Sequence, residues 1–159
     1  MKKNNVIREL EKAKIDFKTL SYEVDESDLS AIALSLKTGI FIGKIFKTLI
    51  LFTDKKELLV SCIQGDGELN LKNLAKLSGC KKVEMLGVKE LFDNTGYVRG
   101  GCSPIGIKKR HRTFIDRSAL NFEKIYVSAG VRGMQIEINP HSLIKYLGME
   151  VSDLQTDTL

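Results

Sequence analysis

The chain has 159 residues, of which 43% are hydrophobic and 28% are charged, and its formal net charge is +5 at pH 7. This length and composition are typical of one soluble globular domain that buries roughly two thirds of its unfolded surface. No apolar run approaches the ~20 residues of a membrane-spanning helix, and the basic N-terminus lacks the apolar stretch of a signal peptide, so we expect a cytoplasmic protein.

The first half of the chain predicts two helices and three strands. Apolar residues at helical spacing indicate the first helix, and runs rich in β-branched and aromatic residues indicate the strands. Ser30 or Asp28 is placed to cap the second helix, and Gly39 is placed to end it. In chain order, the predicted elements are a helix over residues 5–14, a strand over 15–23, a helix that continues to Leu36, and strands over 45–52 and 57–62.

The second half predicts three helices and three strands. Asn70 caps a helix that ends at Gly79, and Pro140 suits the first position of the last helix. The other predicted elements are a short helix over residues 88–92 and strands over 113–115, 124–128 and 134–138. This irregular alternation predicts a mixed β-sheet in one α+β domain over residues 1–152, followed by a polar tail over 153–159 that we expect to fray.

The strand predicted over residues 46–52 carries one lysine among apolar residues. Because side chains alternate along a strand, Lys47 shares a face with Leu49 and Leu51. A lysine in that position either extends to the solvent end of the strand or faces a pocket, and the pattern leaves both readings open. Partial burial would lower its pKa, whereas a bound anion would raise it.

Residues 96–106 contain four glycines, one serine and one proline. Several positions of such a loop can adopt positive φ, and glycines allow a ligand to approach the backbone closely. The loop has neither the GxxxxGK[ST] nor the GxGxxG pattern of phosphate-binding loops. It is either a plain connector or, together with Lys47, one wall of a binding pocket.

No catalytic triad is evident in the sequence. His111 and His141 read as surface residues, and Cys102 reads as a small residue of the glycine loop, because no histidine accompanies it. The three cysteines are widely spaced without a CxxC motif, so we expect no disulfide framework, no metal site and no cofactor. Lys47 remains as the one candidate side chain that could bind a substrate through its positive charge.

Four blocks of the sequence resemble one protein family in their order and spacing. These blocks are FKTL, LNLKNLAKLSGCKKVEM, TGYVRGGCSPIG and IYVSAGVRGMQIEI. They resemble the YbaK/EbsC-type aminoacyl-tRNA deacylases, free-standing relatives of the editing domain inserted in bacterial prolyl-tRNA synthetases, over residues 7–147. The resemblance implies a barrel-like mixed sheet surrounded by helices, and a trans-editing enzyme that cleaves Cys-tRNA(Pro) and Cys-tRNA(Cys).

The same resemblance implies roles for individual residues. It implies that Lys47 holds the substrate, and that the thiol of a cysteinyl substrate attacks its own ester and releases a cyclic thioester. Gln135 stands where close relatives have aspartate, which leaves alanyl-tRNA or another small aminoacyl-tRNA as an alternative substrate. The substrate-binding positions that carry over are Tyr22, Thr48, Gly100, Gly101, Ser103, Ser128 and Gln135.

A basic run follows the glycine loop. Lys108, Lys109 and Arg110 are candidates for contact with tRNA phosphates, although a solvated turn is the ordinary explanation of such a run. The resemblance implies aminoacyl-tRNA as the ligand and prolyl-tRNA synthetase as a candidate partner. A non-catalytic module that binds aminoacyl groups or nucleotides is the alternative from a different functional class.

Overall fold

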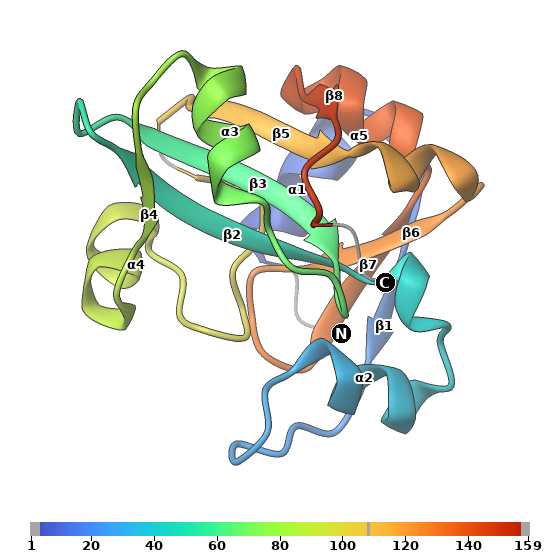
Figure 1. Cartoon of the computed structure of the whole chain (residues 1–159). Helices are drawn as coiled ribbons and strands as arrows, with labels where there is room; N and C mark the ends of the chain where they lie inside the picture. Colours follow the sequence, from blue (N-terminus) through green and yellow to red (C-terminus); the bar gives the residue numbers. More distant parts are fainter. Residues whose placement is uncertain (1–3, 108, 157–159) are drawn as a thin grey trace.

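The computed structural model describes residues 4–107 and 109–156 and shows helices packed around two β-sheets (Figure 1). The helices are α1 (Asn5–Lys12), α2 (Ala31–Thr38), α3 (Leu71–Ser78), α4 (Val88–Thr95) and α5 (Pro140–Leu147), with short 3-10 helices η1 (Ile42–Lys44) and η2 (Arg117–Asn121). The strands are β1 (Phe17–Ser21), β2 (Phe46–Thr53), β3 (Leu58–Gln64), β4 (Val83–Met85), β5 (Arg112–Asp116), β6 (Ile125–Ser128), β7 (Met134–Ile138) and β8 (Glu150–Ser152). None of the described helices is long and apolar enough to span a membrane.

Local capping determines where the helices begin and end. The side chains of Ser30 and Asn70 each accept a hydrogen bond from a backbone N–H in the first turn of α2 and α3, at 3.1 and 3.0 Å. Asp28 instead accepts the hydroxyl of Ser30 at 2.7 Å. Gly39 and Gly79 end the same helices with φ values of 75° and 76°. The predicted boundaries of these two helices are therefore confirmed, with Ser30 as the cap of α2.

The strands form two sheets. One is antiparallel with the order β1-β7-β6, and the other has the order β4-β2-β3-β5-β8. In the second sheet β2 pairs antiparallel with β3 and β4, whereas the β3–β5 and β5–β8 pairs are parallel. The predicted mixed sheet of an α+β domain is confirmed, although the described strands do not close into a barrel.

Hydrophobic clusters lie on both faces of the second sheet. The larger cluster joins α1, the first sheet and α5, with Leu10, Ile136 and Leu143 fully buried. A smaller cluster packs Leu74 of α3 against Leu51 of β2. β2 has apolar contacts on both faces and lies between β4 and β3, so it is an interior strand of the sheet, although β4 covers only its last residues.

The two sheets approach each other where β2 begins. Ile45, immediately before β2, forms an isolated parallel bridge with Tyr126 of β6. On the same side of β2, β4 pairs only with residues 51–53. Among the described strands, none pairs with this edge of β2 over residues 47–49. The candidate site lies along that edge.

The C-terminal residues do not follow the sequence prediction. The expectation that the chain frays after Ser152 is wrong for residues 153–156, because Leu154 is fully buried and its N–H donates to Asp116 Oδ1 at 2.8 Å. The side chain of Gln155 also accepts the backbone N–H of Gln64 at 2.7 Å. One apolar residue within a polar tail completes the cluster beneath α3, and this anchors the segment.

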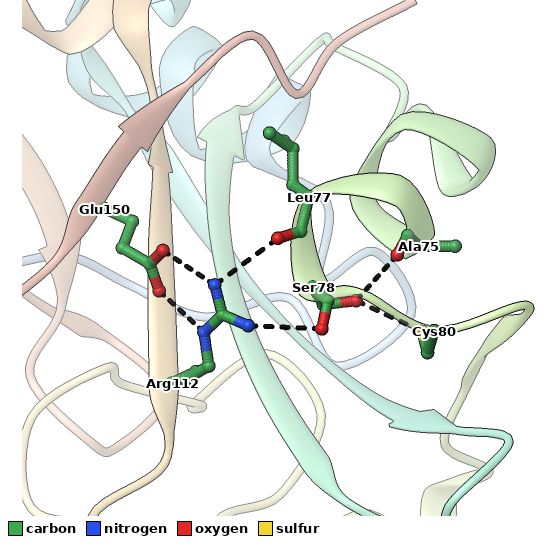
Figure 2. Close-up of polar contacts among 6 residues, drawn as sticks. All are labelled: Ala75, Leu77, Ser78, Cys80, Arg112 and Glu150. Atoms are coloured by element: carbon green, nitrogen blue, oxygen red, sulfur yellow. Dashed lines mark hydrogen bonds and ion pairs between the residues drawn. The ribbon is translucent and has the colours of Figure 1, made fainter.

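Arg112 fastens α3 to the edge of the second sheet (Figure 2). Its guanidinium donates to both carboxylate oxygens of Glu150, at 2.8 and 2.7 Å, and to the backbone oxygens of Leu77 and Ser78, at 3.4 and 3.2 Å. A cation is favourable at the carbonyl end of a helix. Arg112 therefore has a structural role, although it is the last residue of the basic run over residues 108–112.

Candidate active site

A cavity of about 940 Å³ lies along the unpaired edge of β2. The start of β2, the end of β6 and the start of β7 contribute to its wall, together with residues 22–34, residues 85–91 and part of the glycine loop. These segments are far apart in the sequence, and they converge on β2 from α2 on one side and from the β4–α4 region on the other (Figure 1). The cavity therefore lies where the two sheets separate.

Lys47 lies at this cavity on β2. Its Nζ donates to the carbonyl oxygen of Gly65 at 3.2 Å, and the residue is half-buried. Burial lowers the pKa of Lys47, and the carboxylates of Asp66 and Glu68 offset part of that effect. The sequence leaves open whether Lys47 extends to solvent or faces a pocket. In the structure it lines the cavity.

Tyr22 and Thr48 also line the cavity. The backbone N–H of Tyr22 donates to the carbonyl of Gly133 at 2.9 Å, which ties the segment before α2 to the first sheet. Thr48 Oγ1 lies 3.7 Å from the sulfur of Cys62. Burial raises the pKa of Cys62 to about 12, so this thiol stays protonated and acts as a packing residue.

The glycine loop contributes Gly100 and Cys102 to the cavity, but not Gly101 or Ser103. Gly100 has a φ of +83°, and a Cβ at this position would lie 3.2 Å from the side chain of Leu29. Gly101 is buried and packs against the backbone of the loop after β6. Ser103 is fully buried, and its Oγ accepts the N–H of Ile105 at 3.2 Å, so it shapes the turn.

Cys102 does not have the environment of an activated nucleophile. Burial raises the pKa of Cys102 to about 12, which keeps its thiol protonated at neutral pH. Neither His111 nor His141 is among the described residues that line the cavity. The structure thus agrees with the interpretation of Cys102 as a lining residue.

Ser128 and Gln135 face each other across the β6–β7 pair and both line the cavity. Both are buried, with exposed fractions of 9% and 5%. Ser128 Oγ accepts the backbone N–H of Gly130 at 3.1 Å. Gln135 Oε1 has no hydrogen-bond partner. This pair supplies polar groups on the side of the cavity formed by the first sheet.

The basic run does not contribute described residues to the cavity. Lys109 and Arg110 are exposed and are absent from its lining, and Lys108 lies outside the described residues. Instead, the cations that line it together with Lys47 are Lys37, Arg99 and Arg132. The sequence analysis missed these three, although Arg99 and Arg132 stand inside two of the blocks that carry the family resemblance.

Two of these cations hold the segment before α2 in place. Arg132 donates to Glu26 at 2.5 Å and to the backbone oxygen of Arg99 at 2.8 Å, so it joins that segment to the glycine loop. Lys37 donates to the backbone oxygen of Glu23 at 2.9 Å. Glu23 and Glu26 of the cavity wall are therefore each held by a hydrogen bond from a cationic side chain.

The sequence of the chain matches a known protein family. Residues 14–146 match the aminoacyl-tRNA editing domain family. The chain belongs to this family. EbsC from Enterococcus faecalis, named as a candidate Cys-tRNA(Pro)/Cys-tRNA(Cys) deacylase, is 44% identical over 154 residues, which cover 97% of this editing domain and 94% of EbsC.

Other relatives and solved structures match part or nearly all of the chain. A proline–tRNA ligase from Brachyspira hyodysenteriae is 35% identical over 72 residues, which are 45% of this chain and 12% of the ligase. The solved structure of the hypothetical protein APE2540 has a TM-score of 0.89 at 24% identity and covers 96% of this chain and 100% of its own. A candidate trans-editing enzyme for prolyl-tRNA synthetase has a TM-score of 0.81 at 20% identity, with coverages of 98% and 100%. These two structures show the fold.

Proposed function

We propose that this editing domain is a deacylase that acts in trans on cysteinyl-tRNA, with Cys-tRNA(Pro) and Cys-tRNA(Cys) as its substrates. Its similarity to EbsC over nearly the whole of both chains supports this choice of substrate. We further propose that the substrate performs the attack on its own ester, and that Lys47 holds the ester in place.

The observation that carries the proposal is a cavity with a half-buried lysine and without a histidine to activate a nucleophile among its described lining residues. Its serine–carboxylate pairs, Ser27 with Asp25 and Ser30 with Asp28, lie in exposed turns, and these hydrogen bonds lower the pKa of both carboxylates, which makes them weak bases.

The thiol of Cys102 in the cavity is protonated. These observations favour an attacking group that comes from the substrate. The ammonium of Lys47, at the edge of β2, is a donor for the oxygens of such an ester.

A cysteinyl ester supplies the attacking group itself. A free thiol with a pKa near ~8.5 is a few per cent thiolate at pH 7 and is intrinsically nucleophilic. The sulfur attacks the ester carbonyl carbon, the bond from that carbon to the ribose oxygen breaks, and the ribose oxygen takes up the proton that the thiol lost. Water then hydrolyses the released cyclic thioester to free cysteine. By holding thiol and carbonyl together, the cavity supplies proximity.

Such an enzyme is needed because a binding pocket cannot separate cysteine from proline by size alone. Cysteine and proline are similar in size, and a binding pocket separates near-isosteric side chains by only ~1–3 kcal/mol. A second site that tests for a reactive thiol separates them by chemistry instead of by size. Proline has no thiol, so a correctly charged prolyl-tRNA would survive this test.

A panel of aminoacyl-tRNAs tests the proposal. The purified protein is incubated separately with tRNA that carries cysteine, serine, alanine or proline, and ester loss is followed with time. We expect rapid loss of the cysteinyl ester and far slower loss of the seryl ester, because an alcohol is almost fully protonated at pH 7. Equal rates for cysteine and serine would contradict the substrate-assisted reaction.

A second candidate function is deacylation of alanyl-tRNA or another small aminoacyl-tRNA. The neutral amide of Gln135 lines the cavity, and it favours this candidate because YbaK-type members of the resembled family often have aspartate at that position, whereas the amide resembles the EbsC-like branch. Preference for alanine in the panel would support this alternative. Binding of aminoacyl-tRNA without turnover of any ester would support a non-catalytic module.

A further inference from the structure

Gln135 is a buried polar residue of the cavity whose hydrogen bonding is incomplete. Among the described buried side-chain nitrogens and oxygens, only Gln135 Oε1 and Ser61 Oγ have no partner. Ser61 is not among the residues that line the cavity, whereas Gln135 lines it and is 5% exposed. Leaving a buried acceptor unpaired is unfavourable, so this oxygen is not explained by the fold alone.

The backbone around Gln135 holds its side chain firmly. Gln135 lies within β7, the central strand of the first sheet, and pairs with Leu20 of β1 and Ser128 of β6. Two residues further along the same face, the carboxylate of Glu137 accepts the hydroxyl of Tyr126 at 2.5 Å. The protein thus supplies a partner for one polar side chain on this face, but not for the one at the cavity.

The cavity lining also holds carboxylates, but those of Asp25, Glu26 and Asp28 already accept hydrogen bonds from Ser27, Arg132 and Ser30. Lys47 and Ser128 supply donors. Lys47 carries an ammonium, and Ser128 uses its Oγ to accept the N–H of Gly130, which leaves its own hydroxyl hydrogen to donate. An aminoacyl ester has acceptors in its ester oxygens and one strong group of donors, its α-ammonium. The donors of the cavity match the ester oxygens, and the unpaired oxygen of Gln135 matches the α-ammonium.

We infer that the carboxamide oxygen of Gln135 accepts a hydrogen bond from the α-ammonium group of the aminoacyl substrate and thereby orients the ester in the cavity. The inference rests on the proposed deacylase function and assigns one group of the substrate to one residue. It makes Gln135 a specificity residue that distinguishes esters with a free α-amino group from those without one.

Two substrates that differ only in the α-amino group test this assignment. Cysteinyl-tRNA is compared with 3-mercaptopropionyl-tRNA, which keeps the thiol and the ester but lacks the amino group. For the unchanged protein, kcat/KM should fall about tenfold to a hundredfold when the amino group is removed, as expected for a hydrogen bond to a charged group. Gln135→Leu should abolish most of this preference, so that its ratio between the two substrates approaches one.

Two further variants separate this role from a general effect on the fold. Gln135→Glu keeps an acceptor in place and should restore the preference for the amino group, and Gln135→Met provides a second, unbranched apolar replacement if the leucine variant does not fold. Ser61→Ala removes the other unpaired oxygen and should leave the ratio unchanged. An equal loss of kcat/KM for both substrates in Gln135→Leu, or no preference in the unchanged protein, would overturn the inference.

Binding of stable analogues separates this inference from the proposed function. The analogues are 3′-cysteinylamino-3′-deoxyadenosine and its counterpart without the α-amino group, whose amide link replaces the ester. Calorimetry should show about tenfold to a hundredfold tighter binding of the first by the unchanged protein and equal binding by Gln135→Leu. Failure to cleave any aminoacyl-tRNA would contradict the deacylase function alone, whereas equal binding of the two analogues would contradict the role of Gln135 alone.

Discussion

Lys47 supplies a cation to the cavity, but its partial burial destabilises the folded protein. Burial lowers its pKa in the folded protein below the value in the unfolded chain. At neutral pH the charged amine therefore destabilises the folded state, and this penalty disappears only as the pH rises through the pKa of the folded state and on to that of the unfolded chain. A lysine in this position is better explained by a ligand than by the stability of the strand.

We expect Lys47→Ala to lower kcat/KM for cysteinyl-tRNA by more than about tenfold, because the ester loses the cation that holds it. The melting temperature should stay unchanged or rise slightly, since a desolvated charge is removed. Lys44→Ala is the matched control, because Lys44 is an exposed lysine of η1 three residues earlier. A folded Lys47→Ala variant that retains most of its activity would remove Lys47 from the proposed reaction.

Cys102→Ala should keep full deacylation activity. The thiol of Cys102 has a pKa of about 12 because it is buried, so it supplies almost no thiolate at neutral pH. Steady-state kinetics of the variant test this, together with mass spectrometry of the acid-quenched protein. An acyl group found on Cys102 during turnover would show an enzyme nucleophile and contradict the substrate-assisted reaction.

At the level of residues, the sequence alone does not decide whether Lys47 lies in a pocket or extends to solvent. Alternation along β2 gives the face of a side chain, but not what covers that face. Here the cover comes from residues 22–34 and 85–91, which no local pattern connects with β2. The unpaired oxygen of Gln135 was unpredictable for the same reason, because burial and the lack of a partner are properties of the packed sheet.

The glycine loop and the segment before α2 form a coupled pair of elements around the cavity. Gly100 lies against Leu29, and Arg132 joins the backbone of Arg99 to Glu26. Neither contact involves a strand. The width of the cavity mouth therefore depends on how closely these two loops pack.

Gly100→Ala and Gly96→Ala form a matched pair that measures this packing. Both glycines have a φ near +80°, but a Cβ at Gly100 would meet Leu29 at 3.2 Å, whereas a Cβ at Gly96 would meet nothing within 4 Å. Both variants should lose about 1 kcal/mol of stability from the left-handed backbone. Only Gly100→Ala should also raise KM severalfold. Equal kinetics of the two variants would show that the contact with Leu29 does not affect the site.

At the level of elements, strong local signals made most of the fold predictable. The caps Ser30 and Asn70 and the runs of β-branched residues locate α2, α3 and β2. The sequence does not predict β4 or β8, because each has three residues and is defined by pairing with a distant strand. The basic run was assigned to the site by its nearness to the glycine loop in sequence, and that nearness does not place Lys109 or Arg110 at the cavity.

At the level of the whole molecule, the proposed tRNA substrate is larger than this chain of 159 residues. Such a domain can contact the acceptor end of a tRNA but hardly reach its anticodon. We therefore expect the isolated protein to deacylate cysteinyl-tRNA with either the proline or the cysteine anticodon at similar rates. Addition of prolyl-tRNA synthetase should shift the ratio towards the proline type, and strong discrimination by the protein alone would contradict this partner model.

Salt dependence tests which cations contact the tRNA. Neutralising Lys108, Lys109 and Arg110 together should raise KM and flatten its dependence on salt, if the basic run binds phosphates. Replacing Lys37 and Arg99 by alanine is the parallel experiment on cations that line the cavity. Unchanged kinetics in the triple variant would assign the run to a solvated turn, and the effect should then be found in the second variant.

The bridge between Ile45 and Tyr126 joins the two sheets immediately before Lys47 and Thr48 of the cavity wall. The opposite part of that wall, Ser128 and Gln135, belongs to the other sheet. The relative position of the two sheets therefore sets the distance between these polar groups. Substitutions in the hydrophobic cluster behind β6 and β7, remote from every polar group of the site, would tilt one sheet and retune which amino acids fit.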